Sequence, residues 1–304
     1  MTDGEAIESF PCFGGRARVI VRGSGPAGDA PAAASLARRR LLEWHEQFSR
    51  FEPHSELSLF NADPRSTVPV SPVMARLIEA IVEGARLSGG LVDATLVGEI
   101  EQVGYDAHFG EDSLPLGEIL RRAPQRAAAA PRAHSQLSEV SLDRVAGTVT
   151  RPLGLRFDSG GIAKGLFGDI LAGVLGLHES FAIDCAGDVR LGGAGRLARP
   201  VQVSSPFDDS VLHSFELAEG AAATSGIGRR SWLDHDGEPA HHLLDPSTGR
   251  PAFTGIVQAT ALAPSAVEAE VLAKTALLRG PQGAAATLRH GGLVVRDDGH
   301  VEIV

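Results

Sequence analysis

The feature that most constrains the fold is a change in residue patterning near residue 137. Before it, residues 32–51 and 71–90 repeat apolar side chains at near-helical spacing, which predicts two amphipathic helices. After it, short apolar or alternating runs between glycine turns predict mostly antiparallel strands, with further helices among them. Helices early and antiparallel strands later are typical of an α+β fold, in which helices pack on sheets.

Local signals mark where some of these elements begin and end. A Ser-Pro pair at 71–72 is typical of a helix start, and a Gly-Gly pair at 89–90 is typical of its end. Asp93 can begin a further helix that runs through residue 100. Residues 138–151 predict a hairpin.

The bulk properties indicate a single globular domain. No repeat or clean linker divides the 304 residues, so we expect one domain over 1–304. Residues 106–135 are rich in Ala, Arg and Pro, and we expect a flexible insert there with one short helix. The net charge of −10 argues against a nucleic-acid-binding surface, which needs basic side chains.

The cysteine count and the N-terminal segment bear on the compartment. Two cysteines are too few to staple a secreted fold and favour a reducing environment. The start MTDGEAIESFPCFGG has no basic stretch followed by an apolar run, and no apolar stretch approaches the ~20 residues of a membrane span. We therefore expect a cytoplasmic protein with no membrane segment.

Lysine is rare in this chain. Of 28 basic residues, only Lys164 and Lys274 are lysines. An Ala-, Gly- and Arg-rich composition accounts for the loss of lysine wherever nothing opposes it. A lysine ammonium is compact and rotatable, and the planar fork of arginine cannot replace it at a tight site. The two lysines are therefore candidates for functional positions.

The run DSGGIAKG places Lys164 at the start of a helix. LRFDSGG predicts a strand that ends at Asp158 in the Gly160-Gly161 turn, with the helix beginning near Ile162. Small residues at a helix start leave backbone N–H groups open to an anion, which the helix dipole also favours. A glycine turn alone is usually structural, but together with Asp158 and a solitary lysine it indicates a phosphate site.

The run HHLLDPSTGRP contains a strong turn signal at Asp-Pro-Ser-Thr-Gly. Such a turn would bring His242 close to Asp245. A histidine held by a carboxylate is a plausible general base near neutral pH. The alternative is that Asp245 only caps the turn and His242 is simply half-buried, and this run alone favours that alternative.

Three shorter runs place polar side chains beside small residues. They contain Asp93 and Thr95, Asp188, and Thr224 with Ser225. Hydroxyl and carboxylate groups at strand ends or beside glycines suit contacts to phosphate or ribose. Taken singly, each run is more often an ordinary turn or a helix cap.

The run SAVEAEVLAKT predicts a helix that starts with a capping box at Ser265 and Glu268. Glu270 and Lys274 are then i,i+4 neighbours in the favourable Glu-then-Lys order. They form either an ion pair on the helix surface, worth a few tenths of a kcal/mol, or a pair that points into a functional site.

Together and in this order, the motifs resemble those of the ApbE family, the FAD:protein FMN transferases. The resemblance runs from about Phe48 to the last strand. GGLVDATL resembles the family's G-x-x-D-x-T element, DSGGIAKG its D-x-G-G-x-x-K-G element, and CAGDVRLGG its G-G-D turn, with Ala186 in place of the first glycine. TSG, HHLLDPSTGRP and VQATALAPSAVEAEVLAKTALLRG also match. The resemblance implies an ApbE-like fold of mostly antiparallel sheets with packed helices.

The resemblance also implies a reaction. Such enzymes bind FAD, usually with Mg²⁺, and split its pyrophosphate. The FMN half passes to a threonine or serine hydroxyl of a partner protein as a phosphoester, and AMP leaves. Phosphoryl transfer of this kind needs cations around the phosphates, alignment of the reacting atoms, and a base for the attacking hydroxyl.

Roles carry over from the family by position. His242 would accept the hydroxyl proton, and Asp245 would orient it or shape its loop. Lys164 and the turn before it would face the pyrophosphate. The residues that would bind the flavin nucleotide are Asp93, Thr95, Asp158, Gly160, Gly161, Lys164, Asp188, Thr224, Ser225 and Lys274.

The chain departs from the family at the metal site. The family's last helix usually reads A-D-x-x-x-T, whereas this chain has Glu270 and Lys274 at the Asp and Thr positions. Ala163 and Glu270 are the candidate metal ligands. A protonated lysine cannot ligate a metal and repels a dication. We hypothesise that Lys274 replaces a metal ligand, so that Mg²⁺ binding is weakened or absent.

A second departure lies before the first family strand, where Phe13-Gly14-Gly15 stands in place of M-G-T. The change removes a thioether and a hydroxyl from the side of the pocket expected to hold the flavin ring. Two further functions stay open: an FAD-binding protein, and an FAD pyrophosphatase that yields FMN and AMP. A soluble, cytoplasmic acceptor protein is the expected partner of a transferase.

Overall fold

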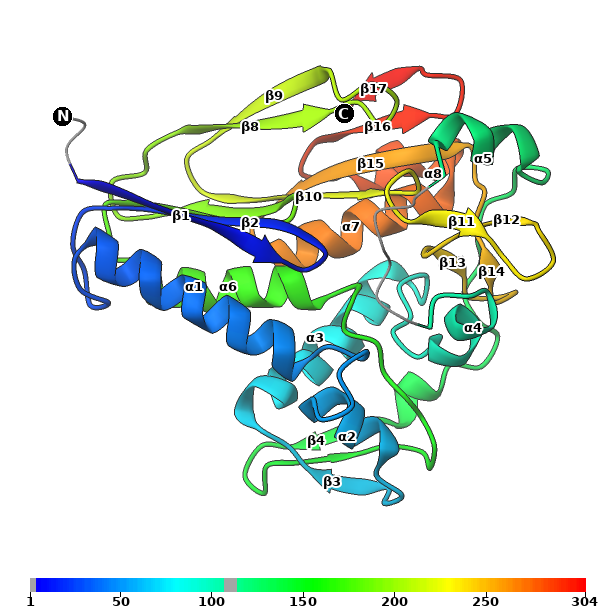
Figure 1. The fold of residues 1–304 in the computed structure, drawn as a ribbon, viewed down its shortest axis with the longest axis horizontal. Coiled ribbons are helices and arrows are strands. Elements are labelled where there is room, and N and C mark those ends of the chain that lie inside the picture. Colours follow the sequence, from blue (N-terminus) through cyan, green and yellow to red (C-terminus); the bar gives the residue numbers. More distant parts are fainter. Residues whose placement is uncertain (1–3, 107–113) are drawn as a thin grey trace.

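The centre of the molecule is one antiparallel sheet (Figure 1). The computed structural model describes residues 4–106 and 114–304. Eight strands follow the order β1-β2-β6-β7-β10-β15-β16-β17, and every neighbouring pair is antiparallel. The strands are β1 (Glu5–Cys12), β2 (Gly15–Arg22), β6 (Ser180–Cys185), β7 (Asp188–Gly192), β10 (Gly220–Gly226), β15 (Ile256–Ala263), β16 (Gly292–Arg296) and β17 (Val301–Ile303).

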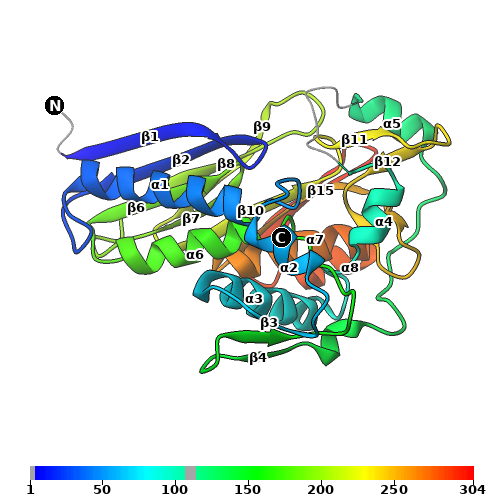
Figure 2. The same cartoon turned by 60° about the horizontal axis from the view of Figure 1, so that its bottom comes forward.

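Three long helices cover one face of this sheet (Figures 1 and 2). They are α1 (Ala30–Gln47), α6 (Ala163–Leu175) and α7 (Ala266–Arg279). Helix α7 packs on β10 and β15 and is covered in turn by α6 and by α3 (Pro72–Ser88). A helix enclosed on all sides needs small or apolar residues around its whole circumference. The alanine-rich sequence of α7 meets this requirement.

The remaining elements are short and lie around this core. The helices are α2 (Glu56–Ala62), α4 (Val97–Gln102), α5 (Leu116–Arg122), α8 (Pro281–Thr287) and the 3₁₀ helix Gln136–Glu139. The strands are β3 (Thr67–Pro69), β4 (Ser141–Asp143) and β5 (Thr148–Thr150) in one sheet, and the pairs β8 (Arg199–Ser204) with β9 (Val211–Leu217), β11 (Ser231–Leu233) with β12 (Pro239–His241), and β13 (Leu244–Asp245) with β14 (Arg250–Pro251).

The structure confirms the α+β class and several predicted boundaries. Ser71 caps α3, with its hydroxyl accepting the Met74 N–H at 3.2 Å, and Gly89 ends the helix in the left-handed region at φ 65°. The hairpin predicted over 138–151 is the β4–β5 pair. The capping box is present only in part, since Ser265 accepts the N–H of Glu268, while the Glu268 side chain pairs instead with arginine and histidine near the C-terminus.

Two local predictions were wrong. In both places, side chains form hydrogen bonds with backbone groups that a strand or a helix would otherwise use. The run before Asp158 forms no strand in the described chain. The amide of Asn61 instead bonds both the N–H and the carbonyl of Phe157 at 2.8 Å. No helix begins at Asp93, since α4 starts at Val97. The Asp93 carboxylate accepts the N–H and hydroxyl of Thr95, which favours a turn over a helix.

Part of the segment 106–135 lies outside the described residues, namely 107–113. The rest contains the short helix α5 and then a run that is neither helix nor strand. That run bonds through its backbone to Phe253 and Leu278, at 3.0 and 2.8 Å. None of the helices within the described ranges is long and apolar enough to cross a membrane.

We expect Gly165→Ala to destabilise the protein and Gly173→Ala, in the same helix, to stabilise it. A Cβ at Gly165 would lie 2.6 Å from the carbonyl oxygen of Ala266, so α6 and α7 would have to separate, at a cost of about 1–3 kcal/mol. A Cβ at Gly173 meets nothing within 4 Å, and alanine there gains about 0.5–1 kcal/mol of helix propensity. Urea unfolding measures both; equal effects would contradict the tight contact.

Candidate functional site

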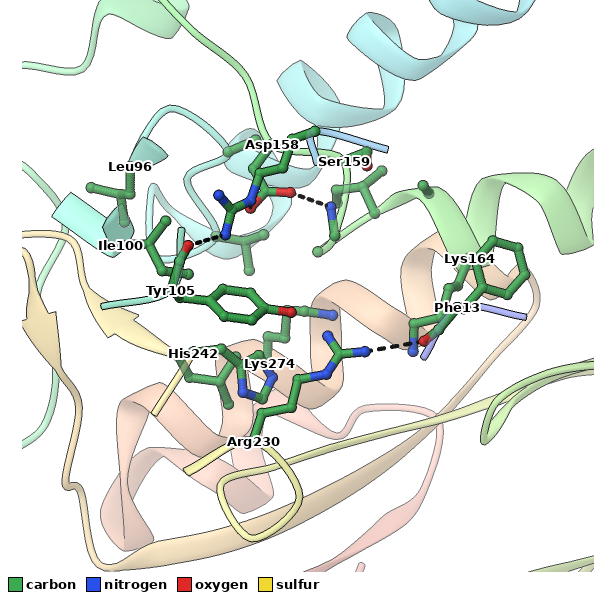
Figure 3. A pocket seen from close by; sticks show the side chains of 18 of the residues that line it. Phe13, Leu96, Ile100, Tyr105, Asp158, Ser159, Lys164, Arg230, His242 and Lys274 are labelled. Atoms are coloured by element: carbon green, nitrogen blue, oxygen red, sulfur yellow. Dashed lines mark hydrogen bonds and ion pairs between the residues drawn. The ribbon is translucent and has the colours of Figure 1, made fainter. Parts of the chain in front are cut away.

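A cavity of about 270 Å³ opens at the end of α7 where several loops converge. Its walls come from the β1–β2 turn, the end of α1, the loop after α3, the turn before α6, the segment 229–230, the segment 242–244 and α7. Figure 3 shows the side chains of Tyr105, Arg230 and Lys274 directed into one space. We call this cavity the central pocket.

The glycine turn before α6 forms one wall of the central pocket. The Asp158 carboxylate accepts the N–H of Gly160 at 2.7 Å, and the Ser159 hydroxyl donates to the carbonyl of Phe48 at 2.7 Å. A Cβ at Gly161 would lie 3.5 Å from Cε of Lys274, so the turn lies against the lysine stem. These contacts hold the backbone of the turn at the pocket surface.

Lys164 follows this turn and is held by a buried carboxylate. Its Nζ forms an ion pair with Oδ2 of Asp188, whose Oδ1 accepts the N–H of Thr224 at 3.1 Å. Burial acts to lower the pKa of Lys164, but the charges of Asp188 and Glu270 outweigh it and raise the pKa above its usual value. Lys164 is therefore a fixed cation at the pocket.

Lys274 is the second ammonium in the pocket wall, and it too has an acid behind it. Its Nζ lies 3.0 Å from Oε1 of Glu270, one helical turn earlier on α7. The other carboxylate oxygen, Oε2, accepts the N–H of Gly165 at 2.9 Å. Of the two readings of this pair, the surface ion pair was wrong: Glu270 is 0% and Lys274 9% exposed.

His242 also lines the pocket, and its ring is neutral. Burial lowers its pKa well below the usual range, and the charges of Arg230, His241 and Lys274 lower it further. Its Nδ1 is buried and has no hydrogen-bond partner among the residues described. The neighbouring His241 does not line the pocket, and burial lowers its pKa to about 3.

The Asp245 carboxylate is occupied within its own turn. It accepts hydrogen bonds from the N–H and hydroxyl of Ser247, at 2.9 and 2.8 Å, and from the N–H of Ala130 at 3.1 Å. It does not line the pocket. Of the two roles considered for Asp245, shaping the loop that carries His242 is the one these contacts support.

The residues singled out from the sequence fall into two groups. Those that line the pocket are Asp93, Asp158, Gly160, Gly161, Ala163, Lys164, His242 and Lys274. Those that do not line it are Thr95, Asp188, Thr224, Ser225, Asp245 and Glu270. Several of the second group support the first, as Thr95 does by donating its hydroxyl to Asp93 at 2.6 Å. The remaining Asp93 oxygen, Oδ2, is buried with no partner in the described chain.

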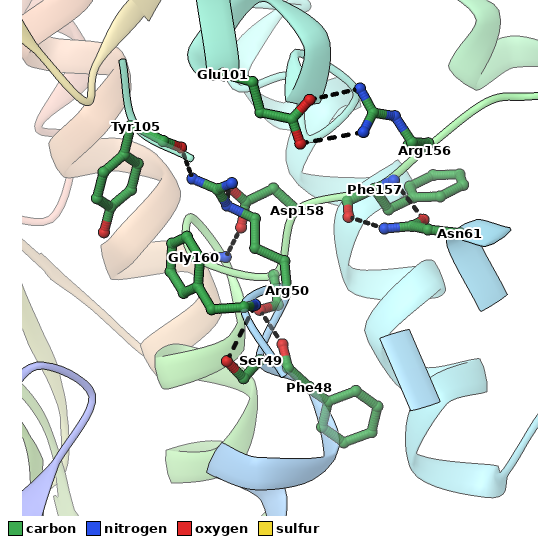
Figure 4. A network of polar contacts seen from close by, with 12 residues as sticks. Phe48, Ser49, Arg50, Asn61, Glu101, Tyr105, Arg156, Phe157, Asp158 and Gly160 are labelled. Atoms are coloured by element: carbon green, nitrogen blue, oxygen red, sulfur yellow. Dashed lines mark hydrogen bonds and ion pairs between the residues drawn. The ribbon is translucent and has the colours of Figure 1, made fainter. Parts of the chain in front are cut away.

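Sequence reasoning missed Arg50, which anchors the turn from the opposite side (Figure 4). Its Nε lies 3.2 Å from Oδ2 of Asp158, and its guanidinium donates to the carbonyl of Tyr105. The guanidinium also lies over the rings of Phe51 and Tyr105, 4.2 and 4.8 Å from their centres. An arginine between two phenylalanines in FSRFEP was the available signal, but its partner Tyr105 is distant in sequence.

Phe13 forms the opposite, aromatic end of the pocket. Both Phe13 and Gly14 in the β1–β2 turn have positive φ, 57° and 70°, a combination that favours Asn-Gly over a bulky first residue. The Phe13 ring stacks on Phe167 at 6.0 Å, and its carbonyl accepts a hydrogen bond from Arg230 at 3.1 Å. Phe13 therefore has an unfavourable positive φ at the position where its ring lines the pocket.

The fold and the pocket define an α+β protein whose central pocket is lined by two lysines, each paired with a carboxylate, and by a neutral histidine. The model of the ApbE family matches residues 13–295 of this chain. The chain belongs to the ApbE family, which confirms the resemblance of its motifs.

Relatives and solved structures agree with this family. The chain is 29% identical over 254 residues to the FAD:protein FMN transferase of Vibrio cholerae, covering 80% of this chain and 72% of that protein. It is 27% identical to the FAD:protein FMN transferase of Treponema pallidum, covering 90% and 78%. The ApbE protein of Thermotoga maritima has a similar fold, with a TM-score of 0.77 at 24% identity and coverage of 98% and 96%. The apo flavinyl transferase ApbE of Pseudomonas stutzeri gives 0.76 at 21%, covering 100% and 96%.

We expect the His242 ring to stay neutral at about pH 5.5, where an ordinary histidine is mostly protonated because its pKa is about 6.5. Burial and the surrounding cations oppose the proton. The unfolded chain takes up this proton and the folded chain does not, so this group reduces stability as the pH falls below about 6.5. Ring ¹⁵N shifts of ¹⁵N-histidine-labelled protein, assigned with His242→Gln, measure the protonation. A midpoint at or above 6.5 would contradict it.

Proposed function

We propose that this chain is an FAD:protein FMN transferase, which attaches FMN by a phosphoester to a threonine or serine of a partner protein and releases AMP. The observation that carries the proposal is the convergence of Lys164, Lys274 and the neutral His242 on one pocket. Membership of the ApbE family and the names of its relatives supply the reaction.

The proposed reaction breaks one phosphoanhydride bond of FAD and forms one phosphoester bond. The acceptor hydroxyl attacks the phosphorus of the FMN half, the bridging oxygen leaves with AMP, and His242 takes the hydroxyl proton. A base that is neutral at the working pH is ready to accept a proton. The low pKa of His242 keeps it in this form.

The cations of the pocket would bind the pyrophosphate in this proposal. Lys164 and Lys274 line the pocket, each with a carboxylate on its other side. Charge builds up on phosphate oxygens and on the leaving group during transfer, and fixed cations stabilise it. The N–H of Gly161 is a further candidate for a phosphate contact, whereas that of Gly160 is donated to Asp158.

The flavin ring is proposed to lie at the aromatic side of the pocket. Phe13, Trp44 and Phe167 line that side, and planar rings stack well on such side chains. Asp93 and Asp158, which also line the pocket, would contact the nucleotide. Thr95 and Asp188 are proposed to act indirectly, through Asp93 and Lys164. Thr224 would act through Asp188, which accepts its N–H.

The acceptor and the compartment complete the proposal. We propose a cytoplasmic acceptor protein that carries the Thr or Ser. Cys12 and Cys185 are both free and buried, which is compatible with a reducing compartment. The proposed reaction includes no step through Mg²⁺.

We expect His242→Gln to slow FMN transfer by about 10²–10⁴-fold, the usual contribution of a general base, while FAD binding changes little. The assay mixes the protein with FAD and a domain that displays a threonine among small residues, and measures flavin fluorescence that survives denaturation. His235→Gln is the control, because His235 is an exposed histidine outside the pocket.

Two other outcomes would replace the proposal with one of its alternatives. Release of FMN and AMP with no labelled acceptor would identify an FAD pyrophosphatase. FAD that stays bound and unchanged would identify an FAD-binding protein.

A further inference from the structure

The Mg²⁺ that the family resemblance implies does not fit the side chains of this pocket. Glu270 is the carboxylate at the candidate metal position, and both of its oxygens already accept hydrogen bonds. Oε1 accepts from Lys274 at 3.0 Å and Oε2 from the N–H of Gly165 at 2.9 Å. Mg²⁺ demands about six oxygen ligands at 2.0–2.1 Å in near-octahedral geometry, so the ion would have to displace the ammonium.

The ammonium is built into the fold at this point. Lys274 extends from α7, which is enclosed by the sheet, α3 and α6. Its stem lies against Gly161, where a Cβ would approach Cε to 3.5 Å. The side chain is 11% exposed, and that of Glu270 is 1%. A lysine this enclosed cannot swing away to admit a dication without losing its partner.

The surrounding charges also favour the ammonium over a divalent ion. Lys164 and Arg230 face the same pocket, and Arg230 and Lys274 both act on His242. The described residues include no group of three or more His, Cys, Asp or Glu side chains arranged to hold a metal. The backbone carbonyl of Ala163 is the other candidate ligand, which leaves the set too small.

We propose that Lys274 supplies, as a covalently attached ammonium, the positive charge that a bound Mg²⁺ would give to the pyrophosphate of the substrate. This inference rests on the proposed function. It makes Lys274 a catalytic residue in the sense of direct substrate contact, with Glu270 as its positioning residue. The enzyme then binds FAD and transfers FMN without a divalent ion.

The test compares wild type with three variants, each with EDTA and with excess Mg²⁺. Lys274→Met removes the ammonium at similar length. The double variant Glu270→Gln with Lys274→Met removes both charges, so that no buried carboxylate is left without its partner. Arg289→Met is the matched control, since Arg289 pairs with Glu268 of α7 on the surface and outside the pocket. FAD affinity by fluorescence titration, metal content by mass spectrometry and FMN transfer are measured.

The expected result is that wild type binds FAD equally, within about twofold, in EDTA and in Mg²⁺, and purifies without stoichiometric metal. Lys274→Met and the folded double variant lose at least tenfold in FAD affinity and in transfer rate, as removal of one charge-assisted contact predicts, whereas Arg289→Met matches wild type. Thermal unfolding identifies which variants are folded.

Three results would overturn the proposal. These are an EDTA-induced tenfold loss of FAD affinity or transfer that Mg²⁺ restores, one bound metal per chain, and wild-type affinity and transfer in the double variant. FAD binding that is indifferent to EDTA and needs Lys274, with no labelled acceptor, would overturn the proposed transferase alone. A wild type that does not bind FAD would overturn both.

Discussion

The contact between the first turn of α6 and the first turn of α7 fixes the geometry on which the central pocket depends. Gly165 allows the two backbones to touch, because a Cβ there would meet the carbonyl oxygen of Ala266 at 2.6 Å. One turn later, the Asp169 carboxylate accepts the first two N–H groups of α7, at 2.8 and 3.0 Å, and so caps that helix from outside. In the opposite direction, Glu270 of α7 accepts the N–H of Gly165 of α6. Lys164 directly precedes Gly165, and Lys274 is connected to the junction through Glu270, so the junction bears on the positions of both lysines.

Each ammonium of the pocket is paired with a carboxylate that lies deeper in the protein than itself. Asp188 is 4% exposed behind Lys164, and Glu270 is 0% exposed behind Lys274. Pairing makes the burial of these charges tolerable, since an isolated buried charge is strongly destabilising. In these two pairs the acid lies inward and the cation faces the cavity, although Asp93 and Asp158 also line it. A ligand with several phosphate oxygens meets the cations first, although the whole chain carries a net charge of −10.

Short motifs predicted the parts of the site whose chemistry is local. The glycine turn, Lys164 and His242 lie within a few residues of their signals, and α+β patterning follows from periodicity alone. The parts that depend on distant partners were not predictable in this way. Arg50 meets Tyr105 only through the fold, and the backbone of Phe157 is satisfied by a side chain from α2 rather than by a strand. Sequence spacing showed that Glu270 and Lys274 are neighbours, but only the packing of α7 showed that they are buried.

The cations that would bind phosphate also set the basicity of the proposed base. Arg230 and Lys274 add to burial in lowering the pKa of His242, which keeps the ring unprotonated but weakens it as a proton acceptor. A bound pyrophosphate would bring negative charge between these groups and offset their effect, which raises the pKa of His242 in the complex. On the proposed function, His242 then becomes a stronger base only when FAD is present. On this proposal the Lys274 ammonium both binds the pyrophosphate and lowers the pKa of His242. A lysine held in one position therefore suits this pocket.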